Sequence, residues 1–253
     1  MITSDVPKIV FIVPYRDRLH QKEFFLRQME HVMEDVPKED YHIYFAHQCD
    51  MREFNRGAMK NCGFLAIKRL YPNDYKNITF VFNDVDTMPI TKNMFDYQTT
   101  TGTVKHFYGF TFALGGIVSI TGGDFEKIGG FPNFWGWGYE DNVLQFRASD
   151  FNLKIDRSQF VKILDRSIVH IQDGSLRAVH RTEYTGDFLR DRNNGLNTIF
   201  HINFEINDLN MIDVNTFFTG KEPNPKDYSI RDLSVPIVRN NTMGFTWTRR
   251  GKR

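Results

Sequence analysis

Two aspartates, Asp84 and Asp86, directly follow a short apolar run at residues 78–82. Alternate residues of an extended segment project to the same side, so both carboxylates would face one ligand. Ligands of parallel α/β sheets bind beyond the carboxyl ends of the strands. Carboxylate oxygens suit Mg²⁺ or Mn²⁺, and such an ion stabilises a departing diphosphate. The same pair is also typical of a turn. Its position after a buried strand makes a metal site an equal alternative.

A second segment, residues 131–141, is rich in aromatic, glycine and acidic residues. Trp135 and Trp137, each followed by one glycine, would expose flat apolar faces on which sugar rings stack. Glu140 and Asp141 stand where a helix is expected to begin, and acidic residues there interact favourably with the helix dipole. That role does not account for the tryptophans, whereas a carboxylate beside a sugar could deprotonate an acceptor hydroxyl as a general base.

The elements that would position these residues alternate between strand and helix. Apolar β-branched runs indicate strands and apolar residues at helical spacing indicate helices. This alternation predicts an α/β fold with a central mixed, mainly parallel sheet. We find no linker or repeat, so residues 1–253 are expected to form one domain. The expected strands are 8–13, 41–46, 78–82, 117–120 and 167–171, and the expected helices are 21–33, 54–70, a short one after Thr121, and 140–149.

Composition narrows the class of protein. The chain has 253 residues, of which 41% are hydrophobic and 25% charged, as in a soluble globular domain. Its net charge of +1 gives no support for nucleic-acid binding. No apolar run approaches the roughly 20 residues that span a bilayer, and the first residues lack a signal peptide, so the chain as given is expected to be cytoplasmic. Cys49 and Cys62 are expected to be free thiols.

Six segments, in order, resemble the β-1,4-galactosyltransferase family (glycosyltransferase family 7). The pattern is closest to the xylosylprotein 4-beta-galactosyltransferase branch. The resemblance runs from residue 9 to about residue 200, so we take residues 8–200 as the recognisable core and 201–253 as a C-terminal extension of the same domain. It implies a GT-A type fold with a Rossmann-like nucleotide-binding half. The matching segments are residues 11–18, 54–64, 84–89, 115–125, 135–141 and 195–197.

The resemblance also implies a role for individual residues. Mn²⁺, with Mg²⁺ as the alternative, would be held by Asp86, His170 and Gln172. The xylose-specific branch has a second histidine where this chain has Gln172. The residues implied to bind the nucleotide sugar are Pro14, Arg16, Arg18, Arg56, Asp84, Gly116 and Trp137.

Catalytic and acceptor roles follow from the same resemblance. Asp141 would be the catalytic base and Glu140 its neighbour that holds sugar hydroxyls. The acceptor would contact Trp137, Tyr139 and Asn142. Many members have an aspartate in place of Asn142, which suggests an unusual acceptor. Ala113 falls where members often carry a bulky residue beside the donor C2 substituent, and a small side chain would admit an N-acetyl group.

The implied function is inverting transfer of galactose from UDP-galactose to a hydroxyl of a carbohydrate acceptor. UDP-GalNAc or UDP-glucose as donor remains open, as does a catalytically inactive sugar-binding module. Animal members of the family are anchored in the Golgi lumen, which would apply here if the chain were trimmed. The loop around Trp137 and the stretch between His170 and Gly195 are expected to close over the donor.

Overall fold

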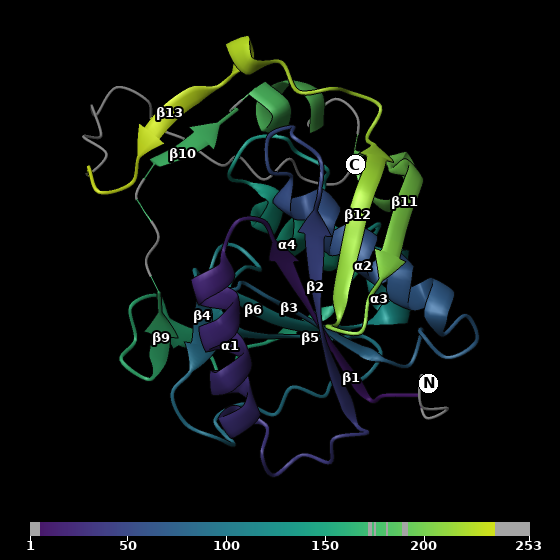
Figure 1. The fold of residues 1–253 in the computed structure, drawn as a ribbon, viewed down its shortest axis with the longest axis vertical. Coiled ribbons are helices and arrows are strands. Elements are labelled where there is room, and N and C mark those ends of the chain that lie inside the picture. Colours follow the sequence, from purple (N-terminus) through teal and green to yellow (C-terminus); the bar gives the residue numbers. More distant parts are fainter. Residues whose placement is uncertain (1–5, 172–173, 175, 181, 189–191, 236–253) are drawn as a thin grey trace, which may run out of the picture.

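The computed structural model describes residues 6–171, 174, 176–180, 182–188 and 192–235. Its centre is a mixed sheet in the order β11-β12-β2-β1-β3-β6-β5-β7, with β8 paired to β5 (Figure 1). The pairs β1–β2, β1–β3, β2–β12, β5–β7 and β5–β8 are parallel, whereas β3–β6, β5–β6 and β11–β12 are antiparallel. The strands are β1 Ile9–Tyr15, β2 Tyr41–Gln48, β3 Thr79–Asn83, β5 Thr103–Gly109, β6 Ile117–Thr121, β7 Lys154–Asp156, β8 Val161–Lys162, β11 Phe200–Ile206 and β12 Met211–Phe218.

Helices cover both faces of this sheet. One apolar cluster joins α1 to the sheet, and the other joins α2, α3 and α4 to the opposite face. Strand β1 supplies both clusters: Phe11 packs on the α1 side and Ile12 on the α2 side, because successive side chains of a strand alternate. Burial on both faces accounts for its continuous apolar sequence. The helices are α1 Leu19–Val32, α2 Arg56–Leu70, α3 Gly122–Lys127 and α4 Glu140–Asp150.

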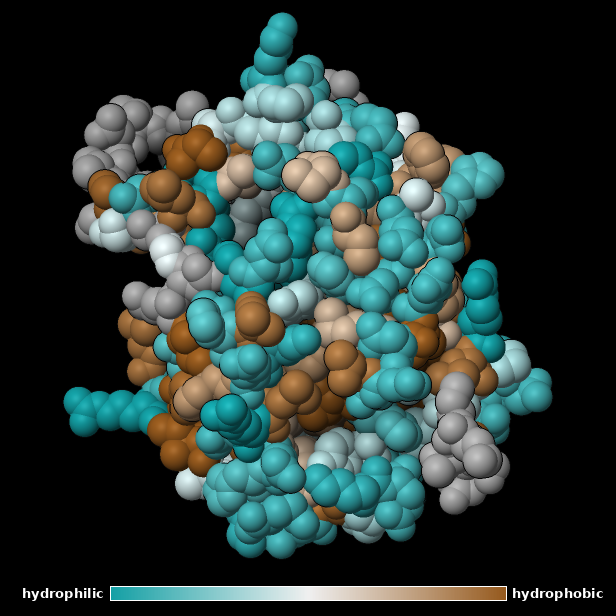
Figure 2. Space-filling model, viewed as in Figure 1, coloured by the Kyte–Doolittle hydropathy of each residue, from teal (hydrophilic) through white to brown (hydrophobic). Residues whose placement is uncertain are grey.

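Two small antiparallel sheets lie outside the central one. Strand β4 pairs with β9, and β10 pairs with β13 near the carboxyl end of β1 (Figure 1). Leu176 of β10 and Ile230 of β13 are 61% and 69% exposed, and this pair of strands is visible as a hydrophobic area in Figure 2. The remaining elements are β4 Thr87–Pro89, β9 Ile168–His170, β10 Leu176–Val179, β13 Ser229–Asp232, a π-helix Glu183–Phe188 and the 3₁₀ turns Leu196–Thr198 and Pro225–Asp227.

Local signals in the sequence define several of these ends. The side chain of Asn55 accepts a hydrogen bond from the Ala58 amide at 2.8 Å and caps α2. Thr121 caps α3 in the same way, as the sequence predicted. Strand β1 continues through Pro14 to Tyr15. Proline is accepted there because the pairing of β1 with β3 ends at Ile12, so beyond it only β2 is a partner.

Sequence analysis missed five strands of the central sheet, namely β5, β7, β8, β11 and β12. The segment from Asp208 onward was expected to mix turns with short strand-like pieces. Strand β12 is instead eight residues long and pairs in parallel with β2. Within the described residues no helix is long and apolar enough to cross a membrane. Cys49 and Cys62 are free, as expected.

Candidate active site

A cavity of about 350 Å³ lies where the carboxyl ends of β1 and β3 meet the start of α2. Residues far apart in the sequence form its wall, and β10 contributes Leu176, Arg177 and Ala178. This is the position at which parallel α/β sheets bind ligands. The predicted site residues in the wall are Pro14, Arg16, Arg18, Arg56, Asp84, Asp86, Trp137 and Glu140.

The guanidinium of Arg56, at the start of α2, is shared among three carboxylates. Nη2 donates to Asp84 Oδ1 and Oδ2 at 2.6 and 2.7 Å. Nη1 donates to Glu140 Oε1 at 2.6 Å and to Asp141 Oδ1 at 3.0 Å. Burial lowers the pKa of Arg56, but the charges of Asp141, Asp84 and Glu140 outweigh it and raise the pKa well above its usual value. The sequence assigned Arg56 to the diphosphate; here it joins the end of β3 to the start of α4.

Lys60, one helical turn after Arg56, adds a second positive charge that sequence analysis did not identify. Its side chain is only 2% exposed, with Nζ 3.5 Å from Asp141 Oδ1 and 3.9 Å from Asp84 Oδ1. Burial and the neighbouring Arg56 lower the pKa of Lys60. Residues four apart on a helix share a face, and that spacing was the available signal.

The pKa values of the two adjacent carboxyl groups of α4 are shifted in opposite directions. Burial raises the pKa of Asp141, but Arg56 and Lys60 outweigh it, so the net pKa lies below the usual value and the group stays ionised. Burial is the largest influence on Glu140 and raises its pKa. Glu140 Oε2 is buried and has no hydrogen-bond partner among the described residues. An ionised Asp141 thus lies next to Glu140, which lines the cavity and whose Oε2 has no hydrogen-bond partner among the described residues.

Asp86 and His170 lie together across the small sheet of β4 and β9. Thr87 is registered opposite His170, and His170 Nε2 is 4.0 Å from Asp86 Oδ2. Burial and then the Asp84 charge raise the pKa of Asp86. Two ligands at about 2.1 Å from an octahedral ion are about 3.0 Å apart when adjacent and about 4.2 Å apart when opposite, so this pair fits one divalent cation. Gln172 falls outside the described residues.

Glycines let the backbone of the β5–β6 connection approach the acidic groups. Gly116 has φ +72°, and a Cβ there would lie 2.4 Å from the Tyr108 carbonyl oxygen. Its own carbonyl accepts a hydrogen bond from the Asp84 amide at 3.2 Å. A Cβ at Gly115 would lie 2.2 Å from Asp141 Oδ2. The position of the candidate base therefore depends on a residue without a side chain at 115.

The two tryptophans have different environments. The expectation that both expose their faces was wrong for Trp135, which is 2% exposed, stacks on Phe217 with centroids 5.4 Å apart, and donates from Nε1 to the Lys221 carbonyl. Trp137 is 41% exposed in the cavity wall, and its amide donates to the Ala178 carbonyl at 2.7 Å. Trp135 anchors the segment, which leaves Trp137 available to a ligand.

Glu183 is a further residue that sequence reasoning missed. It is buried in the π-helix, and its two carboxylate oxygens accept the amides of Trp135 and Gly136 at 3.0 and 2.9 Å. The carboxylate thereby fixes the backbone just before Trp137. An isolated glutamate 47 residues away from Gly136 carries no sequence signal for such a contact.

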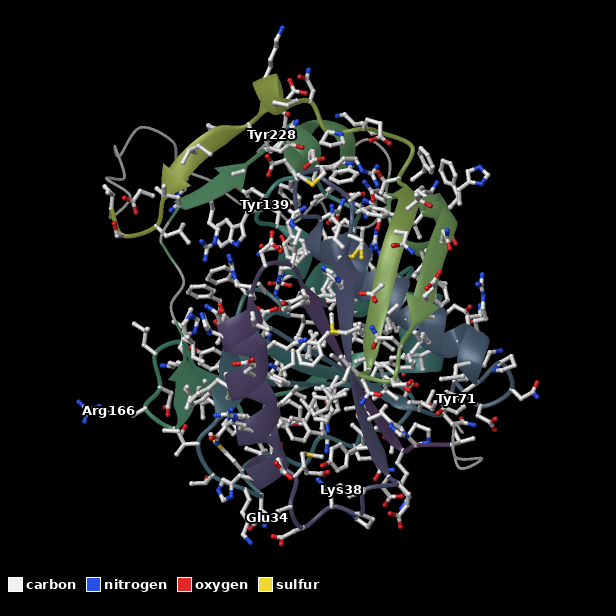
Figure 3. The ribbon with its side chains drawn as sticks, in the orientation of Figure 1. Glu34, Lys38, Tyr71, Tyr139, Arg166 and Tyr228 are labelled. Atoms are coloured by element: carbon white, nitrogen blue, oxygen red, sulfur yellow. The ribbon has the colours of Figure 1, made fainter. Side chains whose placement is uncertain are left out.

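Six predicted residues within the described part of the chain do not line the cavity. Asp141, His170 and Gly116 are three of them, and the other three are Tyr139, Asn142 and Ala113. Tyr139, labelled in Figure 3, has φ +70° and stacks on Tyr184 with centroids 4.5 Å apart. Asn142 Nδ2 donates to the Phe112 carbonyl at 3.1 Å. Ala113 is 7% exposed. Asn142 therefore holds the segment that contains Ala113, and an acceptor or donor role for these residues stays a prediction.

The fold is of the GT-A type. Over 83% of this chain and 94% of the other, it superposes on the catalytic domain of Drosophila β1,4-galactosyltransferase 7 in complex with xylobiose, with a TM-score of 0.63 at 21% identity. A mutant of that enzyme, in complex with manganese, UDP-Gal and xylobiose, gives a TM-score of 0.62 at 20% identity. At this identity, the similarity establishes the fold alone.

Sequence comparison identifies the family. Residues 4–98 match the N-terminal region of glycosyl transferase group 7, and residues 99–171 match the N-terminal domain of galactosyltransferase. The chain is 32% identical over 160 residues to xylosylprotein 4-beta-galactosyltransferase of Caenorhabditis elegans, covering 59% of this chain and 53% of that protein. It is 29% identical over 175 residues to beta-1,4-galactosyltransferase 1 of Bos taurus, covering 66% and 42%. The chain belongs to glycosyltransferase family 7, and its match spans about half the length of these curated relatives.

Proposed function

We propose that this protein transfers a hexose, with galactose as the first candidate, from a UDP-sugar to a hydroxyl of a carbohydrate acceptor, with inversion at the anomeric carbon. The observation that carries the proposal is the meeting of Asp86, Arg56, Glu140 and Trp137 in one cavity. Relatives of the chain are named as galactosyltransferases. UDP-Gal and manganese are bound by a protein of the same fold.

The donor would lie between the arginines and the β4–β9 sheet. Arg16 and Arg18 stand at the end of β1 in the cavity wall, where guanidinium groups can bind phosphate oxygens in a bidentate manner. Asp86 and His170 would hold Mn²⁺, which when bound neutralises the charge that develops on the departing diphosphate. The unpartnered Glu140 Oε2 would accept a hydroxyl of the transferred sugar.

Asp141 would act as the general base. Its pKa is held below the usual value, so it is ready to accept a proton at neutral pH. It takes the proton from the acceptor hydroxyl, whose oxygen forms the new bond to the anomeric carbon while the bond to UDP breaks on the opposite face. A single displacement of this kind requires one base and no protein nucleophile, and it inverts the configuration.

The test is release of UDP from a panel of UDP-galactose, UDP-GalNAc and UDP-glucose, with carbohydrate acceptors, in Mn²⁺ or in EDTA. We expect release in Mn²⁺ from one donor, and at least a 10²-fold loss in Asp141→Asn, as is typical of removing a general base. Release from UDP-GalNAc would identify the alternative donor that Ala113 suggested. Binding of UDP and Mn²⁺ without turnover of any donor would contradict transfer and favour the inactive sugar-binding module.

A further inference from the structure

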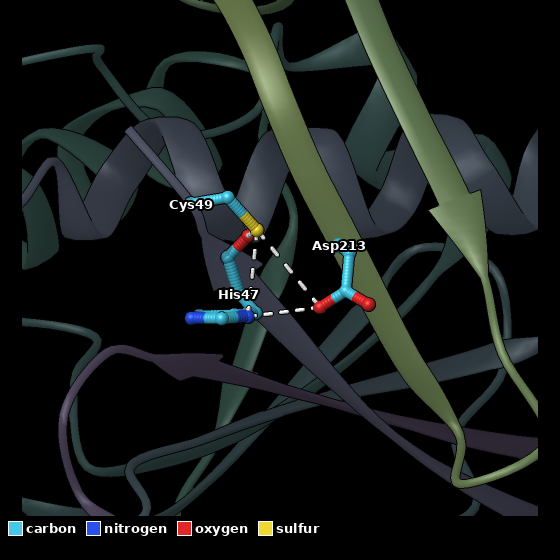
Figure 4. A group of neighbouring side chains, drawn as sticks. All are labelled: His47, Cys49 and Asp213. Atoms are coloured by element: carbon cyan, nitrogen blue, oxygen red, sulfur yellow. Dashed lines mark hydrogen bonds and ion pairs between the residues drawn. The ribbon is translucent and has the colours of Figure 1, made fainter. Parts of the chain in front are cut away.

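A second cluster of chemically reactive side chains lies outside the cavity described above. At the carboxyl end of β2, His47 Nδ1 is 2.8 Å from Asp213 Oδ1 of β12 (Figure 4). Cys49 Sγ is 3.5 Å from His47 Nδ1 and 3.9 Å from Asp213 Oδ1. None of the three belongs to the wall of the candidate active site.

The backbone fixes the relative position of these three residues. His47 and Asp213 are registered opposite each other in the parallel pair β2–β12, so their side chains leave the same face. Cys49 is two residues after His47, so its side chain lies on the same face. Its amide donates to the Val214 carbonyl at 3.0 Å, which continues the pairing to this point. The backbone pairing of β2 with β12 thus fixes the positions of these three residues.

The distances resemble those among the ligands of a tetrahedral zinc ion. Zinc binds sulfur at about 2.3 Å and imidazole nitrogen or carboxylate oxygen at about 2.0–2.2 Å, which places such ligand atoms about 3.3–3.6 Å from one another. The three observed separations are 2.8, 3.5 and 3.9 Å. Shifts of about half an ångström would bring all three into this range.

The type of the ligands also selects the metal. A thiolate suits zinc, whereas Mg²⁺ and Mn²⁺ prefer oxygen ligands. Asn207 Nδ2 donates to Asp213 Oδ2 at 3.0 Å, which orients the carboxylate and leaves Oδ1 toward the other two side chains. His47 and Asp213 are 28% and 31% exposed, so an ion can enter and a water molecule can complete the tetrahedron.

We propose that His47, Cys49 and Asp213 bind one zinc ion that fastens the hairpin β11–β12 to β2. Binding replaces the proton of the Cys49 thiol, which is released to solvent, and the thiolate and carboxylate together balance the charge of the ion. The hairpin lies beyond residue 171, where the family match ends. The site is therefore assembled from one strand inside the matched region and one strand outside it, and it does not depend on the transferase activity.

The first test uses Co²⁺ as a spectroscopic substitute in the full chain stripped of metal with a chelator. The wild type should take up one equivalent with a thiolate-to-cobalt charge-transfer absorption, and Zn²⁺ should displace it. Cys49→Ser should abolish the absorption, because the remaining Cys62 is buried in the core and the candidate manganese ligands include no thiol. His47→Asn should weaken Zn²⁺ binding about 100-fold or more. His201→Asn, an exposed histidine on β11, is the matched control and should bind like the wild type.

The second test is thermal unfolding with and without Zn²⁺. At about 100 times the dissociation constant, Zn²⁺ should raise the Tm of the wild type by about 5–10 °C and leave that of Cys49→Ser unchanged. Equal Zn²⁺ affinity in the wild type and in Cys49→Ser, or no charge-transfer absorption, would overturn the proposal. The cluster would then be a hydrogen-bonded contact between two strands.

Discussion

Arg56 contacts Asp84, Glu140 and Asp141 in the structure, while the sequence assigned its guanidinium to the diphosphate of a donor. The two roles are compatible, because a bound diphosphate is negatively charged and would compete with the carboxylates for the Arg56 guanidinium. Until then Arg56 balances buried acidic groups that would otherwise repel each other. The residue that is proposed to bind the donor thus also balances the charges of the three carboxylates.

Arg56→Lys is the substitution that separates charge from geometry. Lysine retains the charge but cannot form the bidentate contact with Asp84, nor reach the α4 carboxylates at the same time. We expect kcat/KM for the UDP-sugar to fall about 10²-fold, together with a lower Tm, since breaking a buried ion pair is strongly destabilising. Steady-state kinetics and thermal unfolding measure both. Arg27→Lys, an exposed position on α1, is the control; equal effects in the two variants would refute this role of Arg56.

Asp86→Asn tests how much the buried carboxylate of Asp86, the proposed metal ligand, lowers the stability of the metal-free protein. The folded pKa of Asp86 is raised above the unfolded value, so its ionised form destabilises the metal-free protein. That cost is absent below the unfolded pKa, grows as pH rises through the interval between the two values, and is complete above the folded pKa. Without metal at neutral pH, Asp86→Asn should therefore raise the Tm, and the gain should vanish at acid pH.

Addition of Mn²⁺ should reverse this order, so that the wild type has a higher Tm than Asp86→Asn. The wild type should gain stability by binding the ion, while Asp86→Asn should gain little. Thermal unfolding across pH, with Mn²⁺ and with EDTA, gives all four curves. A variant that is less stable than the wild type in EDTA at neutral pH would contradict the predicted cost.

Among the elements, those with strong local signals were predicted, and those that depend on a distant partner were missed. Strand β1 is apolar at every position up to Pro14, and α2 has a capping Asn55, so short windows of sequence suffice. Strand β12 mixes polar and apolar residues, and it is a strand because β2 offers an open edge to pair with. The same holds for the candidate site, where residues next to a local signal were predicted and residues placed by a distant contact were missed. Asp84 and Asp86 were found from a strand end, whereas Glu183 depends on a contact made in three dimensions.

Gly115→Ala tests how the β5–β6 connection positions Asp141, the proposed catalytic base. The added Cβ would lie 2.2 Å from Asp141 Oδ2, so the carboxylate must move. A displacement of about 1 Å at a reacting group can cost about 10²-fold in rate. We expect kcat to fall by about that factor while UDP and Mn²⁺ still bind, as measured by steady-state kinetics and equilibrium titration.

Gly123→Ala is the matched control for Gly115→Ala. A Cβ at 123 meets its nearest atom, the Lys76 carbonyl oxygen, at 3.4 Å, and the position needs no positive φ. This variant should have wild-type kinetics. If Gly115→Ala also retained wild-type kcat, Asp141 would not require its observed position, and its assignment as base would be lost.

At the scale of the whole molecule, the C-terminal hairpin β11–β12 packs against a segment that lines the cavity. Phe217 of β12 is fully buried and stacks on Trp135, and the Arg52 guanidinium lies 4.5 and 4.7 Å from the centroids of these two rings. Trp135 in turn fixes the segment that presents Trp137 to the cavity. A strand outside the family match thereby supports the loop that is expected to close over the donor.

Phe217→Ala tests this connection. Removing a buried phenylalanine typically costs about 3–5 kcal/mol of unfolding free energy. If the stack supports the loop, the variant should also bind the UDP-sugar more weakly at a temperature where it remains folded. Denaturant unfolding and equilibrium binding give the two quantities. Phe218→Ala, at the neighbouring position that is 44% exposed, should change both only slightly. A destabilised Phe217→Ala variant with unchanged donor affinity would show that the hairpin supports the fold and not the loop.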